Sequence, residues 1–324
     1  MRLEVEAERW PLRKPFRISR GTKADCELVS VRLADAAHAG RGEGAPVTYH
    51  GETAASLAEA VEALRPRLEA GLTRAELQAL MPRGGARNAV DCALWDLEAK
   101  RAGRSIWELL ALSPRPVETA YTIGLDTREA MIADAEAAAG RRLLKLKLDA
   151  ADPLGALEAL HAARPDARFI LDANGALAVD EVARLAGDFA RLGAVLLEQP
   201  CAVGADEGLE GIASPVPLCA DESCQDRSDL PGLVRRYRYV NVKLDKAGGL
   251  TEALALASAA RAEGLRLMVG CMLGTSLAMA PAFVVAQGAE FVDLDGPLLL
   301  ARDRAPAIAY AAGRMDVFAP ALWG

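Results

Sequence analysis

The sequence predicts an α/β protein in which a closed parallel barrel follows an N-terminal α+β unit. Between residues 113 and 297, eight short runs rich in β-branched residues or leucine alternate with Ala-, Leu- and Glu-rich helical stretches. Residues 1–112 do not show this repeat. A doubly wound open sheet would carry a glycine-rich phosphate turn after its first strand, and Ile123-Gly124-Leu125-Asp126 is not such a turn.

The N-terminal unit combines strands with helices. Leu3, Val5 and Ala7 alternate with charged residues, and residues 28–33 continue the alternation after a turn near Gly21. The Gly/Pro-rich stretch at 40–51 predicts a loop. Apolar residues at helical spacing predict helices over 56–70, 73–80 and 86–102. We therefore expect an α+β domain over residues 1–112.

The barrel domain is expected over residues 113–297. Its strands are predicted at 119–123, 143–148, 169–172, 194–198, 217–221, 239–243, 267–271 and 291–295, and residues 276–288 are expected to form a helix. The tail, residues 298–324, is expected to pack back on the N-terminal domain.

Composition excludes several classes of partner. The 324 residues carry a net charge of −7 and no basic stripe, so a nucleic-acid partner is not expected. No apolar run predicts a signal segment or a membrane span. The six cysteines form no CxxC pair, which indicates free thiols in a reducing cytoplasm. The sequence leaves the oligomeric state open, and a homo-oligomer is compatible with it.

Three carboxylates end successive predicted strands. Asp172, Glu198 and Asp221 are about one strand–helix unit apart, and the C-terminal strand ends of such a barrel surround the active site. Converging carboxylates repel one another, and a divalent cation removes that conflict. Oxygen ligands without His or Cys favour Mg²⁺, with Mn²⁺ as the alternative. Each acid alone would be explained as a cap of the following helix.

Lysines occupy equivalent positions on two other strands. Lys145 and Lys147 are two residues apart, so they share one face, while the flanking leucines form the opposite, apolar face that packs against helices. Lys243 ends the sixth strand, across the barrel from Lys147; Lys246 follows in the loop before two glycines. Two amines on opposite sides of one carbon can remove a proton and return it on the other face. Their proximity predicts a lowered pKa for at least one of Lys145 and Lys147.

The eighth strand supplies Asp293 and Asp295, again two residues apart. Since the metal already has three ligands, this pair is expected to bind a cationic group of the substrate, such as an ammonium.

These motifs together resemble the dipeptide epimerases of the enolase superfamily, in the muconate-lactonizing enzyme subgroup and especially the L-Ala-D/L-Glu epimerase branch. The resemblance covers nearly the whole chain. It rests on Pro15-Phe16-Arg17, Ala93-Leu94-Trp95-Asp96-Leu97, Tyr121-Thr122-Ile123-Gly124, Lys145-Leu146-Lys147, Leu171-Asp172-Ala173-Asn174, Glu198-Gln199-Pro200, Asp221-Glu222-Ser223, the run from Asn241 to Gly249, Gly270-Cys271-Met272 and Asp293-Leu294-Asp295.

The resemblance implies a modified (β/α)7β TIM-like barrel under an N-terminal capping domain that the tail rejoins. It implies an isomerase that, with one Mg²⁺ per subunit, transfers a proton at the α-carbon of the C-terminal residue of an L-Ala-D/L-Glu-type dipeptide through an enolate. Such an activity belongs to recycling of cell-wall peptide. The implied site residues are the acid/base pair Lys147 and Lys243, the assisting Lys145, the metal ligands Asp172, Glu198 and Asp221, and the ammonium-binding Asp293 and Asp295.

The resemblance also implies that cap loops at residues 17–25 and 44–53 line the pocket. Arg20 and Lys23 are candidates to bind the side-chain carboxylate of a Glu residue, and Thr122 and Cys271 are expected beside the substrate. Exposed loop charges would explain Arg20 and Lys23 equally well. The preferred dipeptide stays open, since relatives accept hydrophobic or cationic second residues.

Four alternatives would use the same barrel scaffold. An o-succinylbenzoate synthase or a muconate cycloisomerase would use the same lysines and metal, but their substrates carry no ammonium for Asp293 and Asp295. A mandelate-racemase-like enzyme would need a His base at a strand end, and His38, His50 and His161 are not at such positions. A catalytically silent binding protein would have no reason to keep two opposed lysines.

Overall fold

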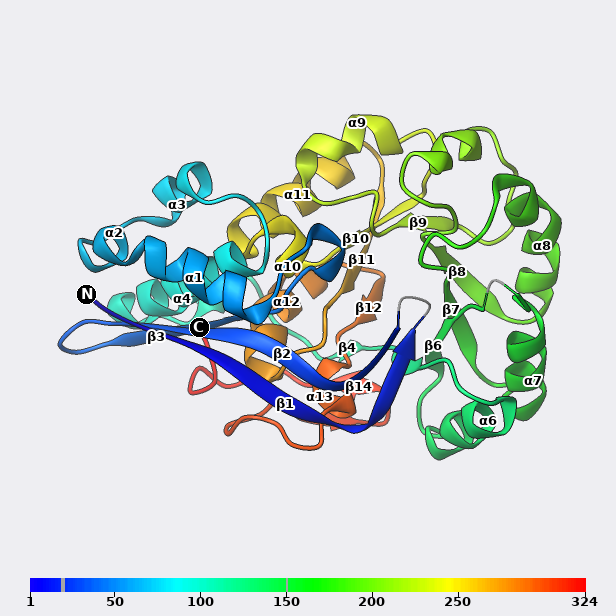
Figure 1. Cartoon of the computed structure of the whole chain (residues 1–324), viewed down its shortest axis with the longest axis horizontal. Coiled ribbons are helices and arrows are strands. Elements are labelled where there is room, and N and C mark those ends of the chain that lie inside the picture. Colours follow the sequence, from blue (N-terminus) through cyan, green and yellow to red (C-terminus); the bar gives the residue numbers. More distant parts are fainter. Residues whose placement is uncertain (19–20, 150) are drawn as a thin grey trace.

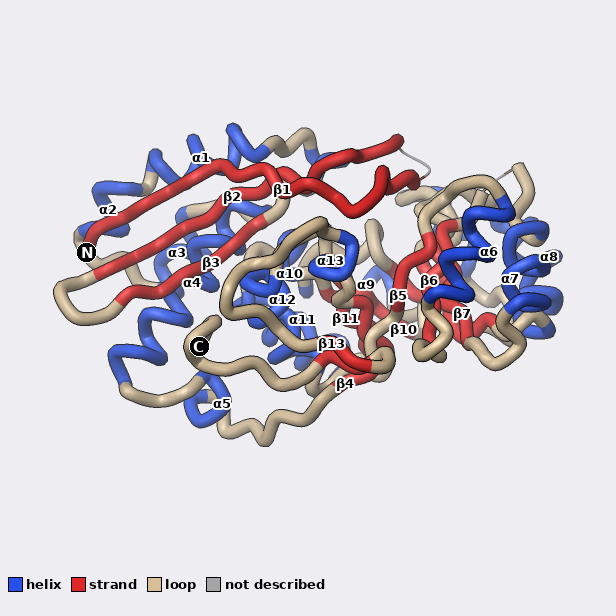
Figure 2. Tube along the Cα trace, turned by 90° about the horizontal axis from the view of Figure 1, so that it is seen from below, coloured by secondary structure: helices blue, strands red, loops and turns tan. Residues whose placement is uncertain are grey.

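A computed structural model describes residues 1–18, 21–149 and 151–324. It shows a cap beside an eight-stranded parallel barrel, so the predicted fold class is confirmed (Figure 1). The cap sheet is antiparallel, and its three strands lie side by side in Figure 2: β1 (Arg2–Ile18), β2 (Gly21–Ala34) and β3 (Ala39–Gly44). The helices up to the barrel are α1 (Ala54–Ala63), α2 (Arg65–Glu69), α3 (Arg74–Leu80), α4 (Gly85–Ala102) and α5 (Ile106–Leu109).

Strand β3 lies where the sequence predicts a loop. Its glycines are required by packing rather than by a turn, because α4 lies directly on this strand. A Cβ added to Gly40, Gly42 or Gly44 would stand 2.0–2.1 Å from a backbone oxygen of α4. The glycines of residues 40–44 therefore do not indicate a loop. They allow the backbone of α4 to lie close to β3.

Replacing Gly42 by alanine should destabilise the cap. The added Cβ would lie 2.0 Å from the backbone oxygen of Ala89, and moving a helix away from a strand costs about 1–3 kcal/mol or more. Gly187→Ala is the matched control, because Gly187 is an exposed position inside α8 (Val179–Arg191) with nothing within 4 Å of its added Cβ. That control should stabilise by about 0.4–1 kcal/mol. Denaturant unfolding measures both, and equal stability of the two variants would contradict the packing argument.

The barrel strands follow chain order around the sheet. They are β5 (Tyr121–Ile123), β6 (Leu143–Lys147), β7 (Arg168–Asp172), β8 (Ala194–Glu198), β9 (Leu218–Ala220), β10 (Tyr239–Val242), β11 (Arg266–Gly270) and β12 (Phe291–Asp293). All eight predicted strands are present, with ends that differ by a few residues. A backbone hydrogen bond of 2.8 Å from Ala120 N to Val292 O joins the two ends of the sheet.

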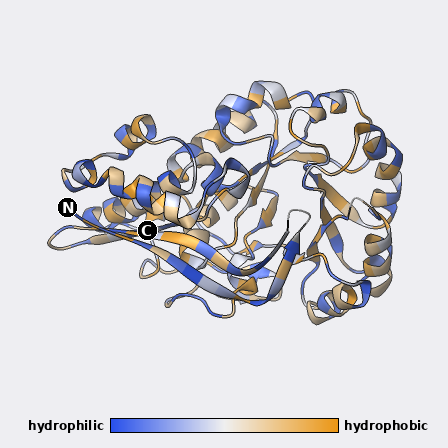
Figure 3. Ribbon diagram, viewed as in Figure 1, coloured by the Kyte–Doolittle hydropathy of each residue, from blue (hydrophilic) through white to orange (hydrophobic). Residues whose placement is uncertain are grey.

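Helices follow the barrel strands, and most of them cover the outside of the barrel. They are α6 (Arg128–Ala137), α7 (Gly155–Ala163), α8, α9 (Leu230–Leu233), α10 (Leu244–Ala247), α11 (Leu250–Ala262), α12 (Ser276–Ala286) and α13 (Gly296–Leu299). Figure 3 shows hydrophilic residues on the outward sides of α7 and α8. The core lies in two layers, because strand side chains alternate. Leu144 and Leu146 pack outward against helices, whereas Leu143 and Ile170 belong to a separate cluster inside the barrel.

The C-terminal segment contacts both parts of the molecule. Its short strands β13 (Tyr310–Ala311) and β14 (Arg314–Met315) extend a small sheet with β4 (Val117–Glu118). Leu300 forms a bridge with Leu12 of β1, and the indole of the fully buried Trp323 donates to Cys92 O of α4 at 3.0 Å. Among the described residues, no helix is long and apolar enough to cross a membrane. The six cysteines are unpaired.

Candidate active site

The ends of β6 to β10 place the charged side chains that the sequence singles out. On β6, alternation sends Leu144 and Leu146 to the helices and turns Lys145 and Lys147 into the barrel, as predicted. Lys243 directly follows β10. Since β6 and β10 are four strands apart in an eight-stranded ring, Lys147 and Lys243 approach from opposite sides.

The three carboxylates are buried and linked through lysines, because Glu198 shares Lys145 with Asp172 and Lys243 with Asp221. Asp172, Glu198 and Asp221 are 0–2% exposed. Lys145 Nζ lies 3.1 Å from Asp172 and 2.7 Å from Glu198. Lys243 Nζ lies 2.7 Å from Asp221 and 4.0 Å from Glu198. The structure therefore brings the predicted acids and amines into one cluster.

Each carboxylate uses its two oxygens differently. One oxygen accepts a hydrogen bond from a donor outside the three lysines: Asn174 N at 3.0 Å for Asp172 Oδ1, Asn241 Nδ2 at 2.8 Å for Glu198 Oε1, and Lys246 Nζ at 2.6 Å for Asp221 Oδ1. The other oxygen faces the inward lysines: Lys147 at 2.5 Å for Asp172 Oδ2, Lys145 at 2.7 Å for Glu198 Oε2, and Lys243 at 2.7 Å for Asp221 Oδ2. Each carboxylate thus turns one oxygen toward an inward-facing lysine.

These residues fit a divalent cation by their chemistry. Glu198 Oε2 is buried without a well-directed hydrogen bond, although the Lys145 ammonium is close to it. The donors are all carboxylate oxygens, the ligands preferred by Mg²⁺ and Mn²⁺. In the part of the chain that the structure describes, no group of three His, Cys, Asp or Glu side chains is arranged to hold a metal ion. The facing oxygens instead contact ammonium groups.

The prediction of a lowered lysine pKa is wrong for Lys145. Burial alone would lower it, but the nearby Asp293, Glu198 and Asp172 hold the pKa of Lys145 well above its usual value. Burial and the repulsion from Lys145 would lower the pKa of Lys243, but Asp221, Glu198 and Asp172 together raise it. Conversely, burial and the charge of Asp172 raise the pKa of Glu198 to about 7. The carboxylates that surround Lys145 come from other strands, so the local sequence around Lys145 does not reveal their effect on its pKa.

Asp293 and Asp295 meet at the end of the last strand. Asp293 ends β12 and lies 2.9 Å from Lys145 Nζ, whereas Asp295 falls just after the strand and accepts from Thr122 N at 2.7 Å. Both are buried. Burial and the neighbouring Asp293 raise the pKa of Asp295 to about 7. Cys271 lies nearby on the pocket wall, and burial raises the pKa of its thiol.

A cavity of about 380 Å³ opens over this cluster between the cap and the barrel. Both predicted cap segments border it, and Arg20 lies outside the described residues. Lys23 is exposed at the cavity wall. The lining includes Phe16, Gly21, Thr22, Lys23, Ala45, Pro46, Thr48 and Tyr49 from the cap, and Thr122, Lys145, Lys147, Asn174, Asp221, Lys243, Cys271, Asp293 and Asp295 from the barrel.

Sequence reasoning missed the side chains that hold the carboxylates from behind. The sequence marks Asn241 and Gln199 only as parts of longer motifs, and it predicts that Lys246 lies in a loop. In the structure Lys246 is 1% exposed, and Gln199 Oε1 accepts from Asp221 N at 2.9 Å. A signal existed for Asn241, because the alternation that turns Lys243 inward turns a residue two positions earlier inward as well.

Two family models match the chain. The model of the mandelate racemase/muconate lactonizing enzyme N-terminal domain covers residues 1–111, and the enolase C-terminal domain-like model covers residues 129–316. The L-Ala-D/L-Glu epimerase of Escherichia coli (strain K12) is 44% identical over 97% of this chain and 99% of its own length. An N-acetyl-D-glutamate racemase from a Pseudoalteromonas species is 41% identical over 92% and 95%.

Solved structures agree with these matches. An enolase family member from Agrobacterium tumefaciens, with bound sodium and L-Ala-L-Glu, superposes with a TM-score of 0.96 at 47% identity over 99% of each chain. Other dipeptide epimerase structures, 25–30% identical to this chain with TM-scores of 0.88–0.91, are complexed with Mg and a dipeptide. The resemblance seen in the motifs is thereby confirmed, and the chain belongs to the mandelate racemase/muconate lactonizing enzyme family of the enolase superfamily.

Proposed function

We propose that this chain is a Mg²⁺-dependent dipeptide epimerase that inverts the α-carbon of the C-terminal residue of an L-Ala-D/L-Glu-type dipeptide. One observation carries the proposal: Lys147 and Lys243 enter one cavity from opposite sides of the barrel, next to a buried group of three carboxylates. A single base can exchange an α-proton but cannot invert the carbon. Two amines on opposite faces can do both.

The lysines alternate in their roles. For one diastereomer, one amine takes the α-proton and the other ammonium returns a proton to the opposite face; for the other diastereomer the roles reverse. An acceptor amine must be neutral, so its carboxylate partners must be engaged elsewhere during the reaction. Lys145, held between Asp172, Glu198 and Asp293, stays protonated and contributes positive charge beside the substrate carboxylate.

Asp172, Glu198 and Asp221 would hold the Mg²⁺ through the oxygens that face the lysines. When bound, the cation neutralises these carboxylates and stabilises the negative charge that develops on the substrate carboxylate as the enolate forms. The three residues come from neighbouring strands, so the barrel fixes their separation before any ligand binds.

The other end of the dipeptide is recognised by Asp293 and Asp295. Two buried carboxylates beside one cavity favour a cationic group, and the substrate ammonium supplies it. Thr122 supports this site, because its backbone N–H holds Asp295, and Cys271 forms part of its wall. At the cap, Lys23 lines the cavity, and we propose that Lys23 and Arg20 bind the side-chain carboxylate of Glu. We place the reaction in the cytoplasm, in recycling of cell-wall peptide.

Isotope exchange tests the proposal. L-Ala-L-Glu incubated with the chain and Mg²⁺ in D₂O should gain deuterium at the α-carbon of its second residue and yield L-Ala-D-Glu, both followed by NMR. N-acetyl-L-glutamate is the matched compound, because it keeps the Glu half and lacks the ammonium. Leaving a buried charge pair without its partner costs about 3–5 kcal/mol, so its kcat/KM should be lower by at least about 10²-fold.

Each other outcome selects a different function. Faster turnover of N-acetyl-L-glutamate would remove the ammonium role from Asp293 and Asp295 and favour an N-acylamino-acid racemase. An o-succinylbenzoate synthase or muconate cycloisomerase would likewise act on substrates without an ammonium. Absence of exchange with a library of dipeptides would support the silent binding protein.

A further inference from the structure

We propose that Asn241 is a positioning residue of the divalent cation site, which holds one oxygen of Glu198 so that the other faces the cation. The inference rests on the proposed function, because it concerns the site in which Glu198 acts as a metal ligand. Asn241 is not among the residues that line the cavity, and we assign its effect to its hydrogen bond with Glu198.

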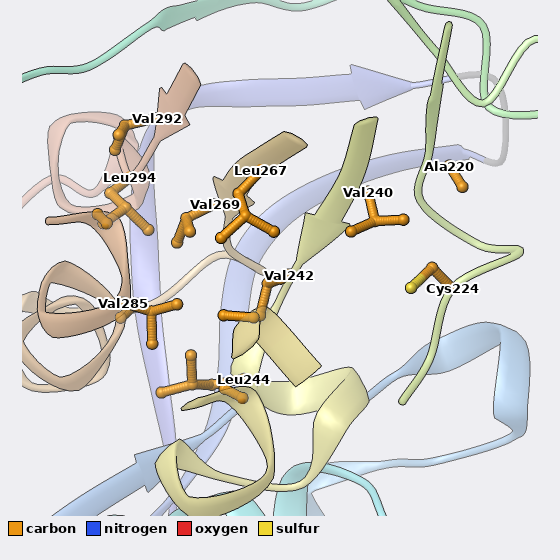
Figure 4. Close-up of a cluster of buried hydrophobic side chains, with 14 of the residues drawn as sticks. Ala220, Cys224, Val240, Val242, Leu244, Leu267, Val269, Val285, Val292 and Leu294 are labelled. Atoms are coloured by element: carbon orange, nitrogen blue, oxygen red, sulfur yellow. The ribbon is translucent and has the colours of Figure 1, made fainter. Parts of the chain in front are cut away.

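Strand alternation places this amide inside the barrel. Val240 and Val242, its neighbours on β10, point outward into the apolar cluster of strands and helices. Figure 4 shows Val242 near Val269 and Leu244, and Val240 on the side of Ala220 and Cys224. Asn241 therefore points inward, and it is completely buried. It is the inward-facing residue next to Lys243 on the same strand, at the level of the carboxylates.

The contacts of the amide define its orientation. Nδ2 donates to Glu198 Oε1 at 2.8 Å, while Oδ1 has no hydrogen-bond partner among the described residues. If the amide were flipped, Oδ1 would face the Glu198 carboxylate, and two acceptor oxygens would repel each other. The carboxylate therefore fixes the orientation of the amide. Gly270 of the next strand provides the room, because a Cβ there would stand 2.8 Å from both amide atoms.

The fold alone does not explain an asparagine at this position. A buried amide with one polar atom left without a partner costs about 1–3 kcal/mol, and leucine has a similar volume without that cost. What asparagine adds is a neutral donor to Glu198. Such a donor fixes the side chain without cancelling its charge, whereas Lys246 brings a positive charge to Asp221. The Asn241 donor therefore leaves the charge of Glu198 to the groups that face its other oxygen.

Mg²⁺ binding by the metal-free full chain tests this role. Isothermal titration calorimetry would compare the wild type with Asn241→Leu, which removes the donor at similar volume, and with Asn241→Ala, which removes it without adding a branched group. Loss of a side chain that orients a metal ligand typically weakens metal binding about 10–100-fold, so both variants should raise the Kd for Mg²⁺ by that factor. Excess Mg²⁺ should restore most of kcat.

Asn88→Leu is the matched control. Asn88 is also a buried asparagine, and its Nδ2 donates to a buried carboxylate, Asp245, at 2.7 Å. That pair lies between cap and barrel, away from the three proposed ligands, so this variant should keep the wild-type Kd for Mg²⁺. The control thus separates loss of a buried amide from loss of the donor to Glu198.

Three results would overturn the inference. A folded Asn241 variant with the wild-type Kd would show that Glu198 needs no positioning. Failure of both Asn241 variants to fold, with Asn88→Leu folded, would assign Asn241 to the fold. A wild-type chain that binds no Mg²⁺ would overturn the proposed function itself, and this inference with it.

Discussion

Lys147→Ala and Lys243→Ala should each abolish epimerisation of L-Ala-L-Glu. Each change removes one of the two groups that transfer the proton, and such a group typically contributes about 10²–10⁴-fold to the rate. Neither residue is part of the apolar core clusters, so both variants should fold. Chiral separation of the two diastereomers over time measures the loss, and circular dichroism checks the fold.

The same variants should differ in what they still catalyse. In Lys147→Ala the remaining amine can remove and return the α-proton on its own face, and Lys243→Ala does the same on the opposite face. We therefore expect deuterium exchange without inversion, with L-Ala-L-Glu for one variant and with L-Ala-D-Glu for the other. This pattern would also assign each lysine to one epimer, which the sequence leaves open.

Lys100→Ala is the matched control for charge removal. Lys100 is a partly buried lysine paired with the buried Asp96 at 2.7 Å, but it lies on α4 of the cap, away from the cavity. Its removal should leave epimerisation unchanged. Full epimerisation by either Lys147→Ala or Lys243→Ala would exclude the two-base mechanism. Deuterium exchange with both diastereomers in each of the two variants would exclude it as well.

The barrel was predictable because its signals are local and repeated. Each parallel strand is a short apolar run, and at six of the eight predicted strands a charged residue at or near the end marks the C-terminal end where the site forms. Alternation also predicted that Lys145 and Lys147 share the inward face. These deductions need only the geometry of a strand and the periodicity of the repeat.

What the sequence could not supply depends on contacts between distant segments. The glycines of β3 are explained by the backbone of α4, 41–53 residues later, and composition alone predicted a loop there. The raised pKa of Lys145 depends on carboxylates from three other strands. For Asn241, strand alternation indicates an inward side chain, but its contact with Glu198 on another strand depends on the fold.

Glu198→Gln should separate metal binding from folding. Because burial and Asp172 raise the pKa of Glu198 to about 7, the neutral isostere should leave the metal-free fold nearly as stable as the wild type. It removes one charged ligand, however, so the stabilisation by Mg²⁺ should disappear together with epimerisation. In the wild type, Mg²⁺ at 100 times its Kd should add about 2.7 kcal/mol to the free energy of unfolding. Thermal unfolding with and without Mg²⁺ measures this difference.

Asp91→Asn is the matched control for this change. Asp91 is another buried acid, and burial raises its pKa to about 6, but it accepts hydrogen bonds from Thr251 between cap and barrel. Its neutral isostere should keep both the Mg²⁺-dependent stabilisation and the activity. Stabilisation by Mg²⁺ that survives in Glu198→Gln would place the cation elsewhere. If Mg²⁺ stabilises Asp91→Asn but not Glu198→Gln, then Glu198, the carboxylate held by Asn241, binds the cation, because both acids are buried and differ mainly in their surroundings.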